Sequence, residues 1–81
     1  MANTTADEQD VSRDEAADLL QNLAREIRGE GPANVEVGNK TVALHPSSAM
    51  SYNIEIEERS PMLGGERQAV TVTLDWESEG E

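Results

Sequence analysis

The feature that most constrains this chain is an unbroken alternation of apolar and polar residues close to its C-terminus, over residues 70–76. Apolar side chains occupy the even positions up to Trp76, and threonine or aspartate occupies the odd ones. Successive side chains on a β-strand point to opposite faces, so this stretch predicts a strand with one apolar and one polar face. Such an apolar face needs a cover, and the earlier apolar segments are the candidates for it.

Three earlier segments alternate in the same way and predict three more strands. They are Val35–Val37, Val42–Leu44 and Met50–Glu57. Gly38 and Asn39 fit the positive φ angles of a tight turn between the first two, and Pro46 ends the second because proline cannot donate to a β-ladder. Strands joined by short connections pair as antiparallel neighbours, so the four segments predict one antiparallel meander.

A helix is predicted ahead of these strands. Ser12 and Glu15 have the spacing of a capping box, and apolar residues recur every three or four positions within Ala16–Ile27. Gly29 or Gly31 supplies the left-handed residue that stops the helix. One helix covers one face of a sheet, so the predicted fold is α+β, with the N-terminal helix packed on one face of a four-stranded antiparallel meander.

The folded domain is predicted to span residues 11–77. Residues 1–10 are acidic and lack periodicity, and residues 78–81 are acidic as well, so both segments are predicted to be disordered tails. The loop at residues 59–67 is too long for a tight turn and carries the apolar pair Met62–Leu63. This pair either folds back over the core or stays exposed for a partner.

The charge of the chain limits what it can bind. Its 17 aspartates and glutamates outweigh 6 lysines and arginines, which gives a formal net charge of −11. Molar salt shortens the Debye length to about 3 Å and strengthens apolar burial, so this composition favours a salt-rich environment. The alternative is an ordinary acidic domain with acidic tails. A chain this acidic forms no basic patch, which argues against nucleic acid as a partner.

The sequence also bears on location. No stretch approaches the ~20 apolar residues of a membrane span, so no membrane partner is expected. The N-terminal residues have neither the basic nor the apolar region of a signal peptide. A cytoplasmic location is therefore expected.

No catalytic, metal or cofactor site is expected. The chain has no cysteine and one histidine, His45, which precedes a proline at the end of a predicted strand. Catalysis needs an oriented nucleophile or two carboxylates in different environments, whereas Glu55 and Glu57 share one solvent-facing side of a strand. The protein is expected not to be an enzyme. The alternative is a small ligand-binding or enzymatic domain with a pocket between the helix and the loop at residues 59–67.

The face of the predicted sheet opposite the helix is the candidate interaction surface. Its centre is uncharged in an otherwise acidic chain, and charge depletion is typical of interface centres. The candidate interface residues are Thr41, Ala43, Asn53, Thr71 and Thr73. They predict a homodimer, and the thin core expected of so small a domain favours association as well. The alternative is that threonine is simply a good β-former on an exposed strand.

Trp76 is open to two interpretations. It either packs against the C-terminal half of the helix and closes the core, or it is a candidate anchor for a partner, since tryptophan is enriched at binding hot spots. With either role, the expected function is a non-enzymatic protein-interaction module.

Three features in this order carry a family resemblance: the helix opening at Val11–Leu20, the Val-Glu-Val-Gly segment at residues 35–38 and the alternating strand that closes at Leu74–Trp76. With them the chain resembles, over residues 11–77, the amphi-Trp domain family, which comprises small domains of haloarchaea and some bacteria. The family name refers to the amphipathic, tryptophan-terminated stretch. The resemblance implies a salt-adapted source and implies no established activity.

Overall fold

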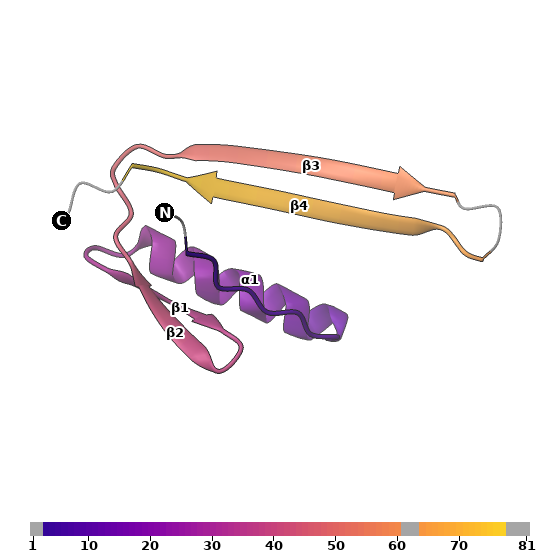
Figure 1. The fold of residues 1–81 in the computed structure, drawn as a ribbon, viewed down its shortest axis with the longest axis horizontal. Coiled ribbons are helices and arrows are strands. Elements are labelled where there is room, and N and C mark those ends of the chain that lie inside the picture. The colour runs from indigo at the N-terminus through magenta and orange to yellow at the C-terminus, as the bar shows by residue number, and fades with distance from the viewer. Residues whose placement is uncertain (1–2, 61–63, 78–81) are drawn as a thin grey trace. The chain divides into compact units, whose positions relative to one another are not determined.

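The computed structural model describes residues 3–60 and 64–77. The elements described there run in the order of one helix followed by four strands (Figure 1): α1 at Arg13–Arg28, β1 at Ala33–Val37, β2 at Lys40–Leu44, β3 at Ser51–Arg59 and β4 at Arg67–Asp75. The chain divides into two compact units, one ending at Pro46 and the other spanning Ser47–Glu77. The first unit holds α1, β1 and β2, and the second holds β3 and β4.

The strands pair as two antiparallel hairpins. β1 pairs with β2, and β3 pairs with β4, each in a two-stranded sheet. The predicted α+β class, with one helix and antiparallel strands, is confirmed for the described part of the chain. The single four-stranded meander predicted from the sequence is not found there, because the strands form two sheets instead of one.

The connection between β2 and β3 accounts for this difference. Its Pro46 has no N–H for a ladder hydrogen bond, and the Ser47 hydroxyl donates a hydrogen bond to the Ala49 carbonyl at 2.7 Å. The segment therefore forms a local bend of its own where a meander needs a hairpin turn. The meander prediction rested on chain adjacency, which treats all connections of similar length alike.

α1 begins at the predicted capping box. The Ser12 hydroxyl accepts the backbone N–H of Glu15 at 3.1 Å, and the Glu15 carboxylate accepts the backbone N–H of Ser12 at 2.9 Å. Gly29 caps the other end in an extended conformation. Of the two glycines predicted to stop the helix, Gly31 is the left-handed one, with φ 87°.

The first hairpin lies beside α1, and its contact with the helix is made by β1. Ala33, at the start of β1, is the one fully buried residue within the described ranges. The backbone N–H of Asn34 donates a hydrogen bond to the Glu26 carboxylate at 3.0 Å, which ties strand to helix. The apolar residues that alternate along β1 and β2 are buried or half-buried, and their polar neighbours are exposed, so the alternation predicted for this hairpin is confirmed.

The turn of the first hairpin depends on one glycine. Gly38 has φ 61°, whereas the described residues include no residue other than glycine with a positive φ, so Asn39 does not contribute one. A single left-handed glycine at the first turn position is typical of a type II′ turn. A Cβ on Gly38 would lie 2.8 Å from a carboxylate oxygen of Asp7, so the segment before the helix passes close to this turn.

The predicted tails are only partly described. Residues 3–12 have no regular secondary structure and are exposed. The disorder predicted for residues 1–10 stays a prediction. Residues 78–81 and the pair Met62–Leu63 lie outside the described residues.

Ser12→Ala is expected to lower the free energy of unfolding by about 1 kcal/mol, because the Glu15 N–H at the helix N-terminus loses its acceptor. Thermal unfolding followed by the helical circular-dichroism signal measures the loss. Ser12→Asp is the matched control, since its carboxylate can accept the same N–H, and it should stay within about 0.5 kcal/mol of the parent. Equal losses in the two variants would contradict the role assigned to the hydroxyl.

Candidate functional site

The hairpin of β3 and β4 carries three cross-strand pairs that are apolar on both strands. The pairs are Tyr52 with Leu74, Ile54 with Val72, and Ile56 with Val70. Opposite residues of an antiparallel pair share a face, and every second residue along a strand returns to that face. The six side chains therefore form one surface, which we call the apolar face.

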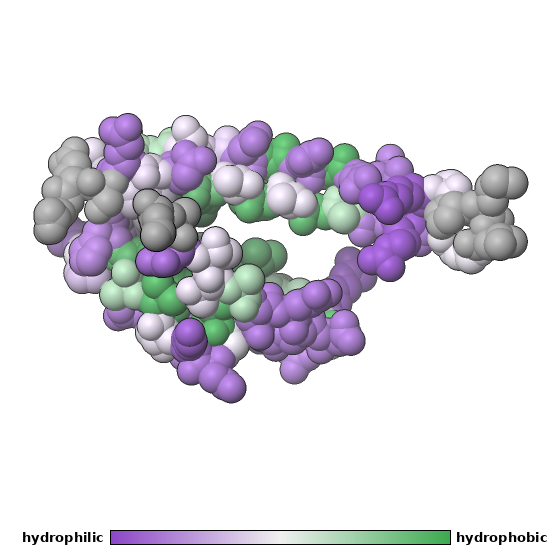
Figure 2. All heavy atoms as spheres, viewed as in Figure 1, coloured by the Kyte–Doolittle hydropathy of each residue, from purple (hydrophilic) through white to green (hydrophobic). Residues whose placement is uncertain are grey.

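The apolar face is exposed. The exposed fractions of Val72, Ile54, Tyr52, Val70 and Ile56 lie between 46% and 67%, and Leu74 is half-buried. Figure 2 shows green apolar side chains along this hairpin beside white and purple ones. Covering the exposed parts of the five side chains would contribute roughly 5–10 kcal/mol. A two-stranded hairpin is marginally stable in water by itself, so this contribution is large compared with the stability of an isolated hairpin.

A polar pair closes the apolar face at the end near residues 59–67. Glu58 lies opposite Gln68, and the Gln68 amide donates a hydrogen bond to the Glu58 carboxylate at 3.2 Å. On the opposite face, the Arg59 guanidinium contacts the Glu57 carboxylate at 3.0 Å, and both side chains are exposed. Exposed ion pairs contribute little, about 0–1 kcal/mol, so these contacts orient the strand ends more than they stabilise the hairpin.

The opposite face of the same hairpin carries three of the five candidate interface residues. Asn53 lies opposite Thr73, and Glu55 lies opposite Thr71, and all four side chains are exposed. Sequence reasoning placed Asn53, Thr71 and Thr73 on one face, as the register does. Thr41 and Ala43 belong to β2 in the first unit, where they share the face of Glu36 and Asn34. The structure thus groups the five residues as three and two, on different hairpins.

Sequence reasoning assigned the side chains of the apolar face to a closed core and did not consider them for binding. The composition already indicated that these side chains could be exposed. The chain has no phenylalanine and one tryptophan, so it has few large side chains with which to cover a second apolar surface. Leu20, in the apolar repeat predicted for the helix, is 63% exposed.

Trp76 follows β4 directly and is half-buried. Half-burial is usual for tryptophan, whose large ring is seldom covered completely. Its two predicted roles, closing the core against the helix and anchoring a partner, both stay predictions.

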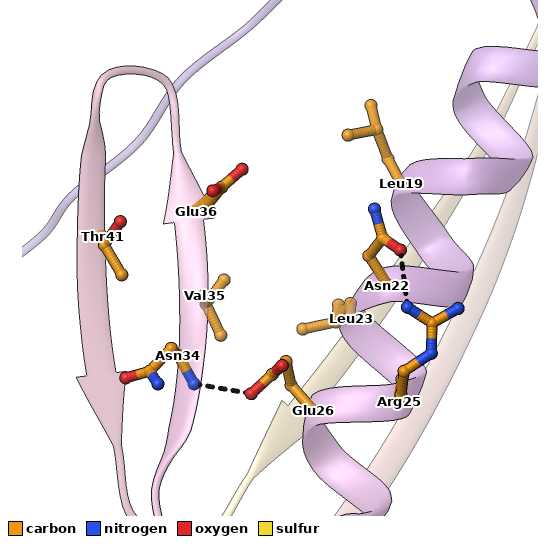
Figure 3. A pocket seen from close by; sticks show the side chains of 9 residues that line it. All are labelled: Leu19, Asn22, Leu23, Arg25, Glu26, Asn34, Val35, Glu36 and Thr41. Atoms are coloured by element: carbon orange, nitrogen blue, oxygen red, sulfur yellow. Dashed lines mark hydrogen bonds between the residues drawn. The ribbon is translucent and has the colours of Figure 1, made fainter.

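A second candidate site is a cleft between α1 and the first hairpin, of about 330 Å³ (Figure 3). Leu19, Leu23 and Val35 form its apolar part, and Asn22, Arg25, Glu26, Asn34, Glu36 and Thr41 form its polar part. Two hydrogen bonds occupy part of this polar lining: the Asn34 backbone N–H donates to the Glu26 carboxylate, and the Arg25 guanidinium donates to the Asn22 side-chain oxygen at 3.1 Å. None of the lining residues is buried, so the cleft lacks the desolvated polar groups that fix a small ligand.

The pocket predicted between the helix and the loop at residues 59–67 is a different one. That loop includes residues 61–63, which lie outside the described residues, so the ligand-binding alternative stays a prediction. His45 is exposed just after β2. Within residues 3–60 and 64–77, no three histidine, aspartate or glutamate side chains gather in a way that could hold a metal ion. The helix described there is neither long nor apolar enough to cross a membrane.

Comparison with known proteins supports the resemblance noted in the sequence. The family model of the Amphi-Trp domain matches residues 1–81. Searches of curated proteins and of solved structures each gave no match. Because the family match extends over the whole chain, this chain belongs to the Amphi-Trp domain family.

Proposed function

We propose that this chain is a non-enzymatic protein-interaction module that works as a homodimer in a salt-rich cytoplasm. The observation that supports the proposal most directly is the exposure of the apolar face on β3 and β4. Contiguous exposed apolar surface on a small soluble domain is typical of a binding site. None of the described residues of the second unit is buried, so this unit gains its packing from whatever covers or extends it.

A second copy of the chain can supply the packing that the second unit lacks. A two-stranded hairpin is marginal in water, and three or more strands with an apolar face, or packing against a helix, are needed for independent stability. A second copy supplies two more strands with the same pattern. It is also present in equal number whenever the chain folds, which a transient partner is not.

High salt is expected to promote association because of the net charge of the chain. Each copy carries −11, so two copies repel each other in dilute salt. At about 1 M salt the Debye length falls to about 3 Å, and this repulsion is screened while apolar burial strengthens. Association is therefore expected to be strongest in the solvent for which the composition is suited.

The mass in solution is expected to be twice the 8.8 kDa of one chain at high salt. Light scattering from about 0.15 M to 3 M salt measures it, and the dimer fraction should rise with salt concentration as the repulsion is screened. A neutral osmolyte such as sucrose, which leaves the Debye length unchanged, controls for general stabilisation. A monomer at every salt concentration would rule out the homodimer.

Val72→Thr replaces one methyl group of the apolar face by a hydroxyl of similar shape. It is expected to raise the dimer dissociation constant about fivefold to tenfold, because the loss of apolar burial costs on the order of 1 kcal/mol. Analytical ultracentrifugation at fixed salt measures the constant.

Thr41→Val is the matched control, because it makes the reverse change at an exposed strand residue of the first unit. It should alter the constant by less than about twofold, as exposed substitutions usually do. If Thr41→Val alone changed the constant, the association would use the first hairpin and the assignment to β3 and β4 would be wrong.

A further inference from the structure

The second unit has two strand edges that form no ladder within the described chain. β3 and β4 make a two-stranded sheet, so each strand pairs along one edge and leaves its other edge open. An open edge is a row of backbone donors and acceptors ready to pair with another strand. Proteins that keep an edge unpaired usually protect it with charged side chains, proline or a bulge.

The two edges differ in this protection. β3 carries Glu55, Glu57, Glu58 and Arg59, which suit an edge that stays in water. β4 has Arg67 at its first position and Asp75 at its last, and all residues between them are uncharged. Neither proline nor glycine interrupts it. β2 is also uncharged after its first residue, Lys40, but it has five residues against the nine of β4, so β4 offers the longer uncharged edge.

We propose that β4 pairs with β4 of a second copy, antiparallel and in full overlap, so that Thr71 lies opposite Thr71 and Arg67 lies opposite Asp75. This inference rests on the proposed function and specifies its geometry. Full overlap of the nine-residue strand gives roughly eight to ten interchain backbone hydrogen bonds, close to the number in a typical interface.

The charges at the strand ends favour this register. Within the hairpin Arg67 lies opposite Arg59, and like charges directly opposite each other are unfavourable. Arg59 has Glu57 as its counter-ion at 3.0 Å. In the paired dimer, Asp75 of the second copy provides a counter-ion for Arg67, on the same face of the sheet. The two-fold symmetry produces this contact twice.

The apolar side chains favour the same register. Val70 lies opposite Val72 of the second copy, so the apolar faces of the two hairpins join into one face on four strands. A shift of one residue would place valine opposite threonine and turn one apolar face away from the other. A shift of two residues keeps the faces but shortens the ladder and separates Arg67 from Asp75.

Single cysteines can report the register, because the chain has none of its own. Thr71→Cys is expected to form a disulfide-linked dimer under mild oxidation, since Cα atoms of directly opposite residues lie about 4.5–5.5 Å apart, within reach of a disulfide. Thr73→Cys is the matched control. Its counterpart in the second copy is about 14 Å away along the strand, so it should not cross-link with itself. A mixture of Thr73→Cys and Ala69→Cys chains should cross-link, because these positions lie opposite each other.

The outcomes separate the two proposals. Cross-linking of Thr71→Cys with Thr73→Cys chains in place of self-linked Thr71→Cys would indicate a shift of two residues and overturn the register. A dimer in which Asn53→Cys on β3 cross-links instead would also overturn it. Both results would leave the homodimer standing. A chain that stays monomeric at every salt concentration would overturn the register and the homodimer together.

Arg67→Asp tests the charges independently. It places an aspartate opposite Asp75 at both ends of the paired strands, and at about 0.15 M salt it should raise the dissociation constant about tenfold. Lys40→Asp in the first unit changes the net charge equally and should have an effect below about threefold. Arg67→Asp combined with Asp75→Arg restores opposite charges and should return the constant close to that of the parent. Equal weakening by Arg67→Asp and Lys40→Asp would overturn the pairing of Arg67 with Asp75.

Discussion

The register of β3 with β4 is the constraint on which the properties of this domain depend. The two-residue period of a strand places apolar side chains on one face of each strand and polar side chains on the other. The antiparallel register then brings the apolar residues of β3 opposite those of β4 in three pairs on one face. The result is a hairpin with a strong difference between its faces and no interior of its own. Exposure of Ile54 or Val72 is therefore a property of the hairpin as a unit, and the proposed association is argued from it.

The first unit handles its apolar residues in another way. Its hairpin has short strands and lies beside a helix, and a hydrogen bond from Asn34 to Glu26 fixes the two together close to the buried Ala33. In the cleft between them, the Arg25 guanidinium donates a hydrogen bond to the Asn22 side chain. The apolar side chains of β1 and β2 are half-buried within this unit, whereas no described part of the second unit covers its apolar face. The division supports the assignment of binding to β3 and β4.

Sequence reasoning succeeded where the determining interactions are local. Ser12 and Glu15 are three residues apart, and the strand segments follow from alternation between neighbours, so the capping box and the strands could be predicted without knowing the rest of the chain. At the first turn, the requirement for a positive φ was foreseen, although Gly38 supplies it alone.

Sequence reasoning failed where distant segments decide the outcome. Alternation shows that Val70 and Val72 share a face, and it cannot show whether another element covers that face. The single meander depended on such long-range arrangement, and the covering of the apolar face by the helix stays a prediction. The choice of Thr71 as a candidate had a sounder basis, because the absence of charge along β4 can be read directly from the sequence.

The contact between Gly38 and Asp7 links the turn to the segment before the helix. A side chain at position 38 would displace the Asp7 carboxylate and would also have to adopt a left-handed backbone conformation. The left-handed backbone is the harder constraint of the two, because the Asp7 carboxylate is the end of an exposed side chain and can rotate away. Glycine is thus expected at position 38 among members of the family whatever residue stands at position 7.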